Sequence, residues 1–128
     1  QSTRTVKQVG YSMMPNFTDG DIFTVVEVPL SELKRGDLVL VIINETQLLK
    51  RLIGFPNETV SISDGLVFIN GTVLVEPYEV TPPTSTIEEI KLEDNSYFVL
   101  GDNRPYSTDS QEWGPVKGDT ILGRATLR

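Results

Sequence analysis

Short runs of apolar and β-branched residues, separated by turn residues, make up most of the chain. Runs at residues 21–28 (DIFTVVEV) and 46–54 (TQLLKRLIG) predict strands, and the near-continuous apolar run at 38–43 (LVLVII) predicts a strand buried on both faces. Within residues 65–75, two β-rich runs flank Asn70-Gly71, the pair preferred in two-residue hairpin turns. The pattern therefore predicts a mainly β chain.

The remaining segments predict little helix. Residues 96–103 (SYFVLGDN) and 119–128 (DTILGRATLR) have the composition of strands, and residues 31–37 (SELKRGD) favour one short helical turn capped by Ser31 and ended by Gly36. Residues 76–95 contain three prolines and six acidic residues, which favours an irregular, exposed excursion. We expect a single domain over residues 1–128, built as a β sandwich or a coiled sheet.

The composition excludes several classes of function. Acidic residues outnumber basic ones by 18 to 11, and the net charge of −7 argues against a nucleic-acid partner, because nucleic acid is bound through a basic surface. The chain has no cysteine and no histidine, so it can form neither a disulfide nor a Ser-His-Asp triad. No loop has the carboxylate spacing of a calcium or magnesium site, and we expect neither a metal nor a cofactor. No apolar run reaches the roughly 20 residues that span a membrane.

Two residues could provide nucleophilic chemistry without histidine. Ser12, in the run GYSMMP, is a candidate nucleophile, although a loop serine is more often solvated or bonded within a turn. Lys50 shares one face of its predicted strand with Leu48 and Leu52. If that face lies at a sheet edge, the lysine points into solvent. If the face is buried, the pKa of the amine falls, and the neutral amine can then act as a base toward serine.

A polar run near the C-terminus could support such a site. Residues 101–116 (GDNRPYSTDSQEWGPV) contain many turn-forming side chains, which by themselves indicate a solvated turn. The apolar stretches YFVL before this run and WGPV at its end favour a part-buried segment with internal hydrogen bonds.

Four runs in this order resemble the conserved boxes of type I bacterial signal peptidases, the membrane-bound serine proteases that remove signal peptides from exported proteins. The runs are GYSMMP at Gly10, KRGDLVLV at Lys34, LLKRLIGFPNETV at Leu48 and LGDNRPYSTDSQEWGPV at Leu100. The resemblance extends from about residue 6 to residue 127. It implies a mainly β, antiparallel coiled-sheet fold and the compact catalytic core of the Gram-positive-like members. The absence of histidine fits the serine–lysine dyad of that family.

The resemblance implies a role for each matching residue. Ser12 is the nucleophile that forms the acyl-enzyme, Lys50 is the general base, and the Ser12 N–H is an oxyanion donor. Gly10 occupies the position where some members carry a serine whose hydroxyl is a second donor. The implied supporting residues are Ser107, which orients the lysine, Asp102 with Arg51, and Asp109.

The resemblance also implies the substrate. The family cleaves after a small residue that has a second small residue two positions before it, the A-x-A pattern, and the extended peptide pairs with strand edges. The implied pocket walls are Val6, Gln8, Val9, Met13, Phe17, Leu48 and Leu49. The alternative for each apolar member is ordinary core packing. Methionine also suits a surface resting on lipid, which makes Met13 and Met14 candidates for membrane contact.

Several features of the family are expected but not seen in these residues. The transmembrane helix that precedes the first box in the family is expected upstream and is absent from this chain. The implied location is the cell membrane, with the catalytic domain on the extracytoplasmic face and signal peptides and the lipid surface as partners.

The chain departs from the family pattern at Asn16, usually threonine, at Asn57-Glu58, usually Gly-Asp, and at Gln111, usually an arginine paired with Asp109.

Three alternatives remain at this point. Self-cleaving repressors of the SOS response share the fold and the dyad but lack the GDNR run. A non-catalytic, signal-peptidase-like assembly partner would typically lack the serine or the lysine, and both are present here. A β interaction domain with coincidental motifs would need all four runs to match by chance.

Overall fold

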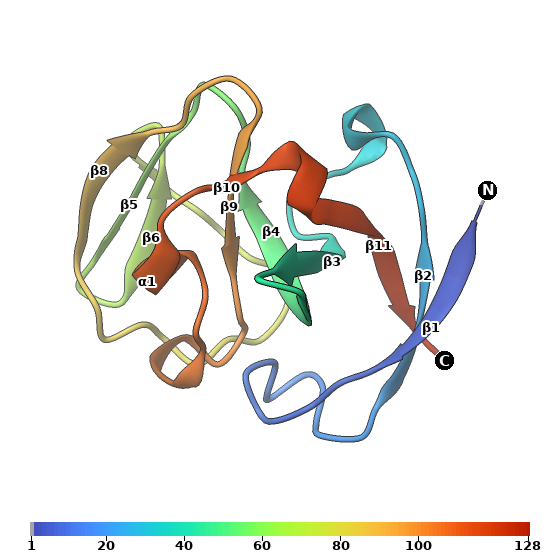
Figure 1. Cartoon of the computed structure of the whole chain (residues 1–128). Helices are drawn as coiled ribbons and strands as arrows, with labels where there is room; N and C mark the ends of the chain where they lie inside the picture. The colour runs from blue at the N-terminus through green and yellow to red at the C-terminus, as the bar shows by residue number, and fades with distance from the viewer. Residues whose placement is uncertain (1) are drawn as a thin grey trace.

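Two sheets form the body of the protein in a computed structural model that describes residues 2–128 (Figure 1). The strands of the larger sheet are β1 (Thr3–Lys7), β2 (Ile22–Val26), β3 (Leu38–Ile43), β4 (Thr46–Gly54), β9 (Ser96–Leu100), β10 (Val116–Lys117) and β11 (Ile121–Leu127). The strands of the smaller sheet are β5 (Thr59–Ser63), β6 (Leu66–Ile69), β7 (Thr72–Val73) and β8 (Ile87–Lys91). The helical elements are α1 (Ser110–Trp113) and three 3-10 turns at Leu30–Glu32, Arg104–Tyr106 and Gly118–Thr120.

Both sheets pair their strands antiparallel. The larger sheet has the order β1-β2-β11-β3-β4-β9-β10, and the smaller has the order β7-β6-β5-β8. In Figure 1 the smaller sheet lies to the left, and β1, β2 and β11 lie to the right beside both termini. The mainly β, antiparallel fold predicted from the sequence is confirmed.

Local signals in the sequence located the central strands. The observed bounds of β3 and β4 match the predicted segments 38–43 and 46–54. The predicted hairpin is also present, because Ile69 pairs with Thr72 across Asn70-Gly71. Asn70 has φ 53° and Gly71 has φ 80°, the two positive values that a type I′ turn requires.

The prediction that residues 76–95 form an irregular, exposed excursion is wrong in its second half. That half contains β8, a regular strand that pairs with β5, and Leu92 directly after β8 is fully buried, although several residues of the half are exposed. Ile87 and Ile90 of β8 pack against the core of the smaller sheet. The prolines of the segment precede β8, so they interrupt no hydrogen bond of that strand.

The short helical elements also differ from the prediction. The turn expected at residues 31–37 spans only Leu30–Glu32, and Pro29 rather than Ser31 occupies its N-cap position without a side-chain hydrogen bond. The helix α1 was not predicted, because four residues are too few to show a helical period. Its N-cap is Asp109, whose carboxylate accepts a hydrogen bond from the Gln111 N–H.

Strands β3 and β4 separate two of the hydrophobic clusters. On one face, Leu40 and Leu49 are paired neighbours and pack in a cluster with Phe23. On the other face, Val41 is paired with Leu48 and packs in a second cluster. The two faces of β4 therefore look toward different parts of the protein, since side chains alternate along a strand.

Strand β1 and the first half of β4 each have one edge without a partner strand. Strand β1 ends the larger sheet, and β4 pairs with β9 only from Arg51 onward. The first half of β4 therefore pairs with β3 alone and has a free edge on its other side. Unpaired edges of this kind can bind a further extended chain.

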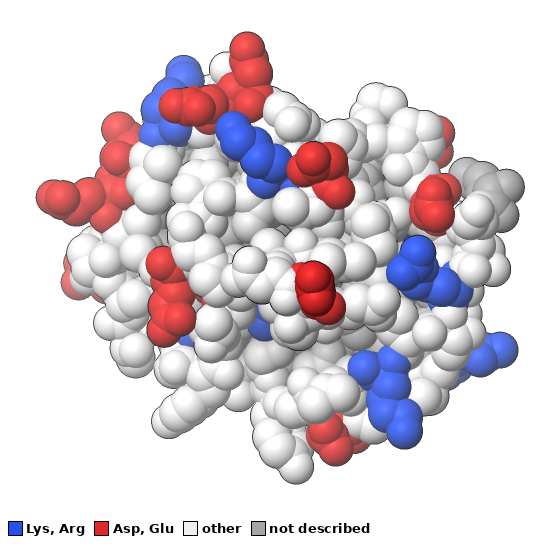
Figure 2. All heavy atoms as spheres, in the orientation of Figure 1, with Lys and Arg blue, Asp and Glu red and all other residues white. Residues whose placement is uncertain are grey.

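The charged side chains on the face of the molecule drawn in Figure 2 are not clearly sorted by sign. Acidic and basic side chains both occur around the outline of the face drawn in Figure 2, and uncharged residues fill most of its middle. None of the helices formed by residues 2–128 is long and apolar enough to cross a bilayer.

Candidate active site

Ser12 and Lys50 lie side by side, although 38 positions separate them in the sequence. Ser12 belongs to a turn-rich segment, the Ser12 loop (residues 10–17), which leaves β1 through Gly10 at φ 88°. Lys50 lies in β4, with its Nζ 3.2 Å from Ser12 Oγ and 3.0 Å from Ser107 Oγ. The structure thus brings three residues of the predicted site together at hydrogen-bonding distance.

Lys50 is buried, which decides between the two alternatives that its sequence position left open. Only 2% of the residue is exposed, and Leu52 on the same face of β4 is fully buried. Burial lowers the pKa of the Lys50 amine, while the negative charges of Asp109 and Asp102 act in the opposite direction and have less effect. The net result is a larger neutral fraction than an exposed lysine has at the same pH.

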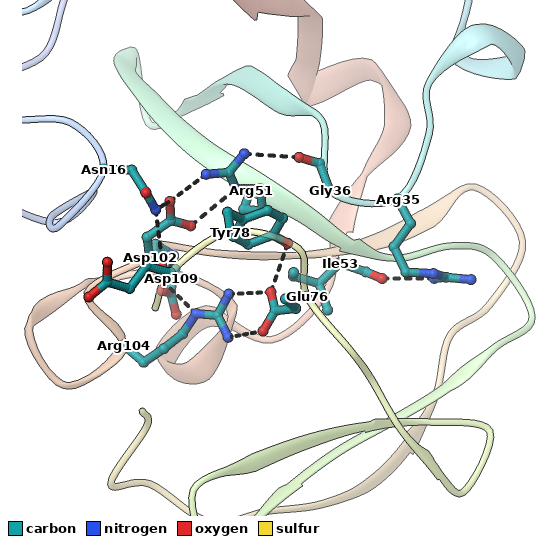
Figure 3. Close-up of polar contacts among 12 residues, drawn as sticks. Asn16, Arg35, Gly36, Arg51, Ile53, Glu76, Tyr78, Asp102, Arg104 and Asp109 are labelled. Carbon is teal, nitrogen blue, oxygen red and sulfur yellow. Dashed lines mark hydrogen bonds and ion pairs between the residues drawn. The ribbon is translucent and has the colours of Figure 1, made fainter. Parts of the chain in front are cut away.

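The residue that follows the lysine in β4 takes part in a buried ion pair (Figure 3). Arg51, the next residue in β4, donates from Nε and Nη2 to the two carboxylate oxygens of Asp102, which is fully buried. Asn16 donates its side-chain amide to the same carboxylate at 2.8 Å. Because Asn16 belongs to the Ser12 loop, the Asp102 carboxylate joins this loop to the strand that carries Lys50.

The polar run that follows β9 contacts the Ser12 loop. Asn103 donates its N–H to the Ser12 carbonyl at 2.9 Å and its side-chain amide to the Tyr11 carbonyl at 3.1 Å. A Cβ on Gly101 would lie 2.2 Å from Ser107 Oγ and 2.6 Å from the Ser12 carbonyl oxygen. Only glycine fits there, and the sequence analysis did not single this residue out.

A segment predicted to be exposed instead braces the ion pair. The Tyr78 ring stacks on the Arg51 guanidinium, with 3.8 Å from the guanidinium carbon to the ring centroid. The Tyr78 hydroxyl donates to Glu76 at 2.7 Å, and the Glu76 carboxylate accepts two hydrogen bonds from Arg104 (Figure 3). Burial, and then the charge of Glu76, raise the pKa of Tyr78. We name residues 76–78 the strap.

Sequence reasoning missed the strap because its contacts are tertiary. Glu76 and Tyr78 lie in a proline-containing stretch without hydrophobic periodicity, which gives no local signal of burial. Arg104, the partner of Glu76, is almost fully buried and also donates from Nε to the Gly101 carbonyl at 2.7 Å. The strap thereby supports the backbone at the close approach of Ser12 and Ser107.

Asp109 is buried among neutral donors. Its carboxylate accepts hydrogen bonds from the Gly101 N–H at 2.8 Å and from the Gln111 side-chain amide at 3.0 Å. Gln111 also donates to the Arg104 carbonyl and accepts from the Ser85 hydroxyl. Within residues 2–128, no lysine or arginine nitrogen lies within 4.0 Å of Asp109, so Gln111 supplies the carboxylate with hydrogen bonds but with no positive charge.

Two cavities meet at Ser12. The first cavity, of about 480 Å³, lies between β1 and the free edge of β4. Five of the predicted pocket residues line it, namely Val6, Gln8, Val9, Leu48 and Leu49. The second cavity, of about 420 Å³, opens on the other side and contains Lys50 in its wall.

Two predicted pocket residues lie elsewhere. Met13 is fully buried in the cluster of Phe23 and Leu40, so it lines neither cavity and cannot contact lipid. Phe17 packs against the same cluster, with its ring edge-on to Phe23 at a centroid distance of 5.1 Å. Both side chains point into the core beneath the Ser12 loop, whereas Met14 is 38% exposed.

The chemistry available at this site is that of a hydroxyl, an amine and backbone amides. Among residues 2–128, no acceptor takes a hydrogen bond from the Ser12 N–H, whereas the Gly10 N–H is bonded to Asp19 at 2.7 Å. No group of three acidic side chains in the described part of the chain is arranged to hold a metal ion.

Known proteins of one family are similar to this chain over most of its length. Residues 2–128 match the family model described as signal peptidase, peptidase S26. The probable signal peptidase I-2 of Synechocystis is 37% identical over 129 aligned positions, which cover 91% of this chain and 58% of that protein. Signal peptidase I T of Bacillus subtilis is 36% identical, over 89% of this chain and 67% of that protein.

A solved structure shows the same fold. The crystal structure of a signal peptidase I from Enterococcus faecalis V583 superposes with a TM-score of 0.65 at 31% identity, and it covers 77% of this chain and 100% of the other. The chain itself spans about 58% of the length of its Synechocystis relative. From the family match over residues 2–128 and these similarities, the chain belongs to the signal peptidase family, peptidase S26.

Proposed function

We propose that this chain is the catalytic domain of a serine endopeptidase that removes N-terminal signal peptides from exported preproteins. One observation carries the proposal: a buried Lys50 amine lies 3.2 Å from Ser12 Oγ at the junction of two cavities. Relatives named signal peptidase I at 36–41% identity support the substrate class.

Acylation uses the neutral lysine. As Ser12 Oγ attacks the scissile carbonyl carbon, its proton passes to Lys50 Nζ and the carbonyl π electrons move onto oxygen. The Ser12 N–H donates a hydrogen bond to this oxyanion, and Gly10 adds no side-chain donor. Ser107 Oγ, 3.0 Å from Nζ, holds the amine in line.

Collapse of the tetrahedral intermediate and deacylation complete the cycle. The C–N bond breaks, and the Lys50 ammonium gives its proton to the departing amine, which leaves an ester on Ser12. Water then attacks the ester carbonyl while Lys50 takes a proton from it. The ester C–O bond breaks, and the proton returns to Ser12 Oγ.

The free strand edges account for binding of an extended peptide. A peptide lying between β1 and β4 can form main-chain hydrogen bonds with both edges. Side chains that enter the first cavity meet Val6, Leu40 and Leu49. In our proposal these walls hold the two small residues of an A-x-A motif.

We also propose that the domain works at the extracytoplasmic face of the cell membrane. Around the second cavity, Val9 is 81% exposed, Tyr11 60% and Tyr106 77%. Apolar and aromatic side chains in such positions suit contact with the boundary between lipid headgroups and acyl chains. Met14 lies next to this surface in the chain and is part-exposed.

The test is cleavage of an A-x-A preprotein by the chain in detergent or lipid, with Ser12→Ala and Lys50→Ala as controls. We expect one cut after the second small residue, a Ser12 ester trapped by an acylating inhibitor, and no cleavage by either variant. Inert wild-type protein that the inhibitor does not label would support the assembly-partner alternative. Self-cleavage without cleavage of added preprotein would support the repressor-type alternative.

A further inference from the structure

The two cavities lie on opposite faces of β4. In the register of β3 and β4, Leu40 opposes Leu49, and both line the first cavity. Ile43 and Lys50 lie on the alternate face and line the second cavity, and Leu48 on that same face borders both cavities. The two cavities therefore reach opposite faces of the sheet and share Val9, Ser12, Thr46 and Leu48 along the free edge of β4.

A substrate strand paired with that edge inherits this alternation. Opposed residues of paired strands point to the same face, and successive residues point to opposite faces. If two small side chains, two positions apart, enter the first cavity beside Leu49, the side chain between them must point to the face of Leu48. That face holds the second cavity.

We propose, on the basis of the proposed function, that the second cavity binds the side chain of the middle residue of the A-x-A motif and favours a large apolar or aromatic one. Its walls include Tyr11, Tyr106 and Trp113 in addition to aliphatic Ile43 and Leu48. Aromatic walls bury much area and favour apolar or ring-shaped ligands. A volume of about 420 Å³ accommodates any single side chain.

The cavity is preformed on one side. Trp113 is half-buried and packs against the cluster that contains Val39 and Val41, which fixes the position of its ring. Among the described residues that line the cavity, Lys50 alone is charged, so a cationic middle residue is disfavoured by repulsion whenever the amine is protonated. A small middle residue leaves the aromatic walls in contact with water.

The test uses matched peptides of sequence Ala-Xaa-Ala with phenylalanine, leucine, lysine or alanine in the middle. We expect wild-type kcat/KM to be about tenfold higher for phenylalanine than for alanine. Tyr106→Ala and Trp113→Ala should each reduce this ratio to about twofold or less. Tyr106 is largely exposed, so its variant remains informative even if Trp113→Ala folds poorly. Leu66→Ala, an exposed apolar change on β6 outside both cavities, should keep the full ratio.

Binding separates this proposal from the enzymatic one. The Ser12→Ala protein should bind the phenylalanine peptide more tightly than the alanine peptide, whether or not the wild type cuts either. Loss of cleavage with a retained binding preference would overturn the proposed function alone. The assignment of the cavity would be overturned if peptide binding did not depend on the middle residue. It would also be overturned if both aromatic variants kept the wild-type preference for phenylalanine over alanine. The same holds if the variants instead change the preference for the residue after the cut.

Discussion

Asn16 donates a hydrogen bond to the Asp102 carboxylate at 2.8 Å, and this contact ties the Ser12 loop to the strand that carries Lys50. The same amide nitrogen also donates to the Glu79 carbonyl at 2.6 Å. One side chain therefore joins three segments that are distant in the sequence. Threonine, usual at this position in the family pattern, is shorter and has one donor.

We expect Asn16→Ala to lower kcat about tenfold and the free energy of unfolding by about 1 kcal/mol, because two acceptors lose a donor and the Ser12 loop loosens. Asn16→Thr, which keeps one hydroxyl donor, should lose less of both. Steady-state kinetics and urea denaturation measure the two effects. An Asn16→Ala protein with wild-type kcat would show that the Ser12 loop is held by its other contacts.

The lowered pKa of Lys50 predicts the pH dependence of activity. Because the neutral amine is the base, kcat/KM should rise with pH through a midpoint below the reference lysine pKa of about 10.4. Lys50→Arg should be inactive at every pH, since arginine stays protonated. A midpoint at or above the reference value would contradict burial of the working amine.

The same shift predicts the pH dependence of stability. Between the folded and the unfolded pKa of Lys50, the unfolded chain binds more protons than the folded one, so stability rises with pH in that window. Lys50→Met removes this dependence. We expect the variant to melt at a higher temperature than wild type at neutral pH and the gap to narrow toward pH 10, as thermal unfolding across pH will show. A constant gap would mean that the lysine is paired as a cation.

Gln111 offers a way to move the catalytic midpoint. An arginine there would place a cation against the Asp109 carboxylate, whose negative charge raises the pKa of Lys50. We therefore expect Gln111→Arg to lower the pKa of Lys50 and to shift the pH profile of kcat/KM toward lower pH. Gln111→Met changes the packing without adding charge and should shift it less. A shift toward higher pH in the arginine variant would contradict this electrostatic account.

The strap predicts a large stability effect far from the reacting atoms. Glu76→Gln leaves the buried Arg104 guanidinium without its carboxylate, and we expect a loss of about 3 kcal/mol in the free energy of unfolding. Glu89→Gln, an exposed change on β8, should cost less than about 0.5 kcal/mol. Urea denaturation with unchanged m-values measures both. Equal stability of the two variants would mean that water replaces the Glu76 carboxylate.

Local patterns predicted the elements whose signals lie within a few residues. The residues of β3, of β4 and of the Asn70-Gly71 turn each carry a local signal for the structure they form. The predicted bounds of β3 and β4 therefore match the observed ones. Strand β8 escaped prediction because its partner β5 lies more than 20 positions away and decides which of its residues are buried. The acidic residues within this segment and the prolines before it favoured a loop.

The sequence likewise predicted some residues of the candidate site and missed others. The motif order indicated which residues meet, and alternation placed Lys50 on one face of β4, yet only the second hydrophobic cluster decides that this face is buried. Met13 shows the converse, because the resemblance implied a pocket wall at this position while its side chain packs in the core beneath the loop. The roles of the strap and of Gly101 depend on contacts between segments, which no local pattern encodes.

The close approach at Gly101 has a consequence for the time at which the site forms. Ser12, Lys50 and Ser107 come from the start, the middle and the last quarter of the chain, and Gly101 is where the last segment meets the first. A nascent chain that has not yet emerged beyond β9 already carries the serine and the lysine. It lacks the hydroxyl that orients the amine and the carboxylate that fixes the loop. Under the proposed function, proteolytic competence coincides with completion of the long-range fold, so that an incompletely folded chain has no assembled dyad with which to cut its neighbours.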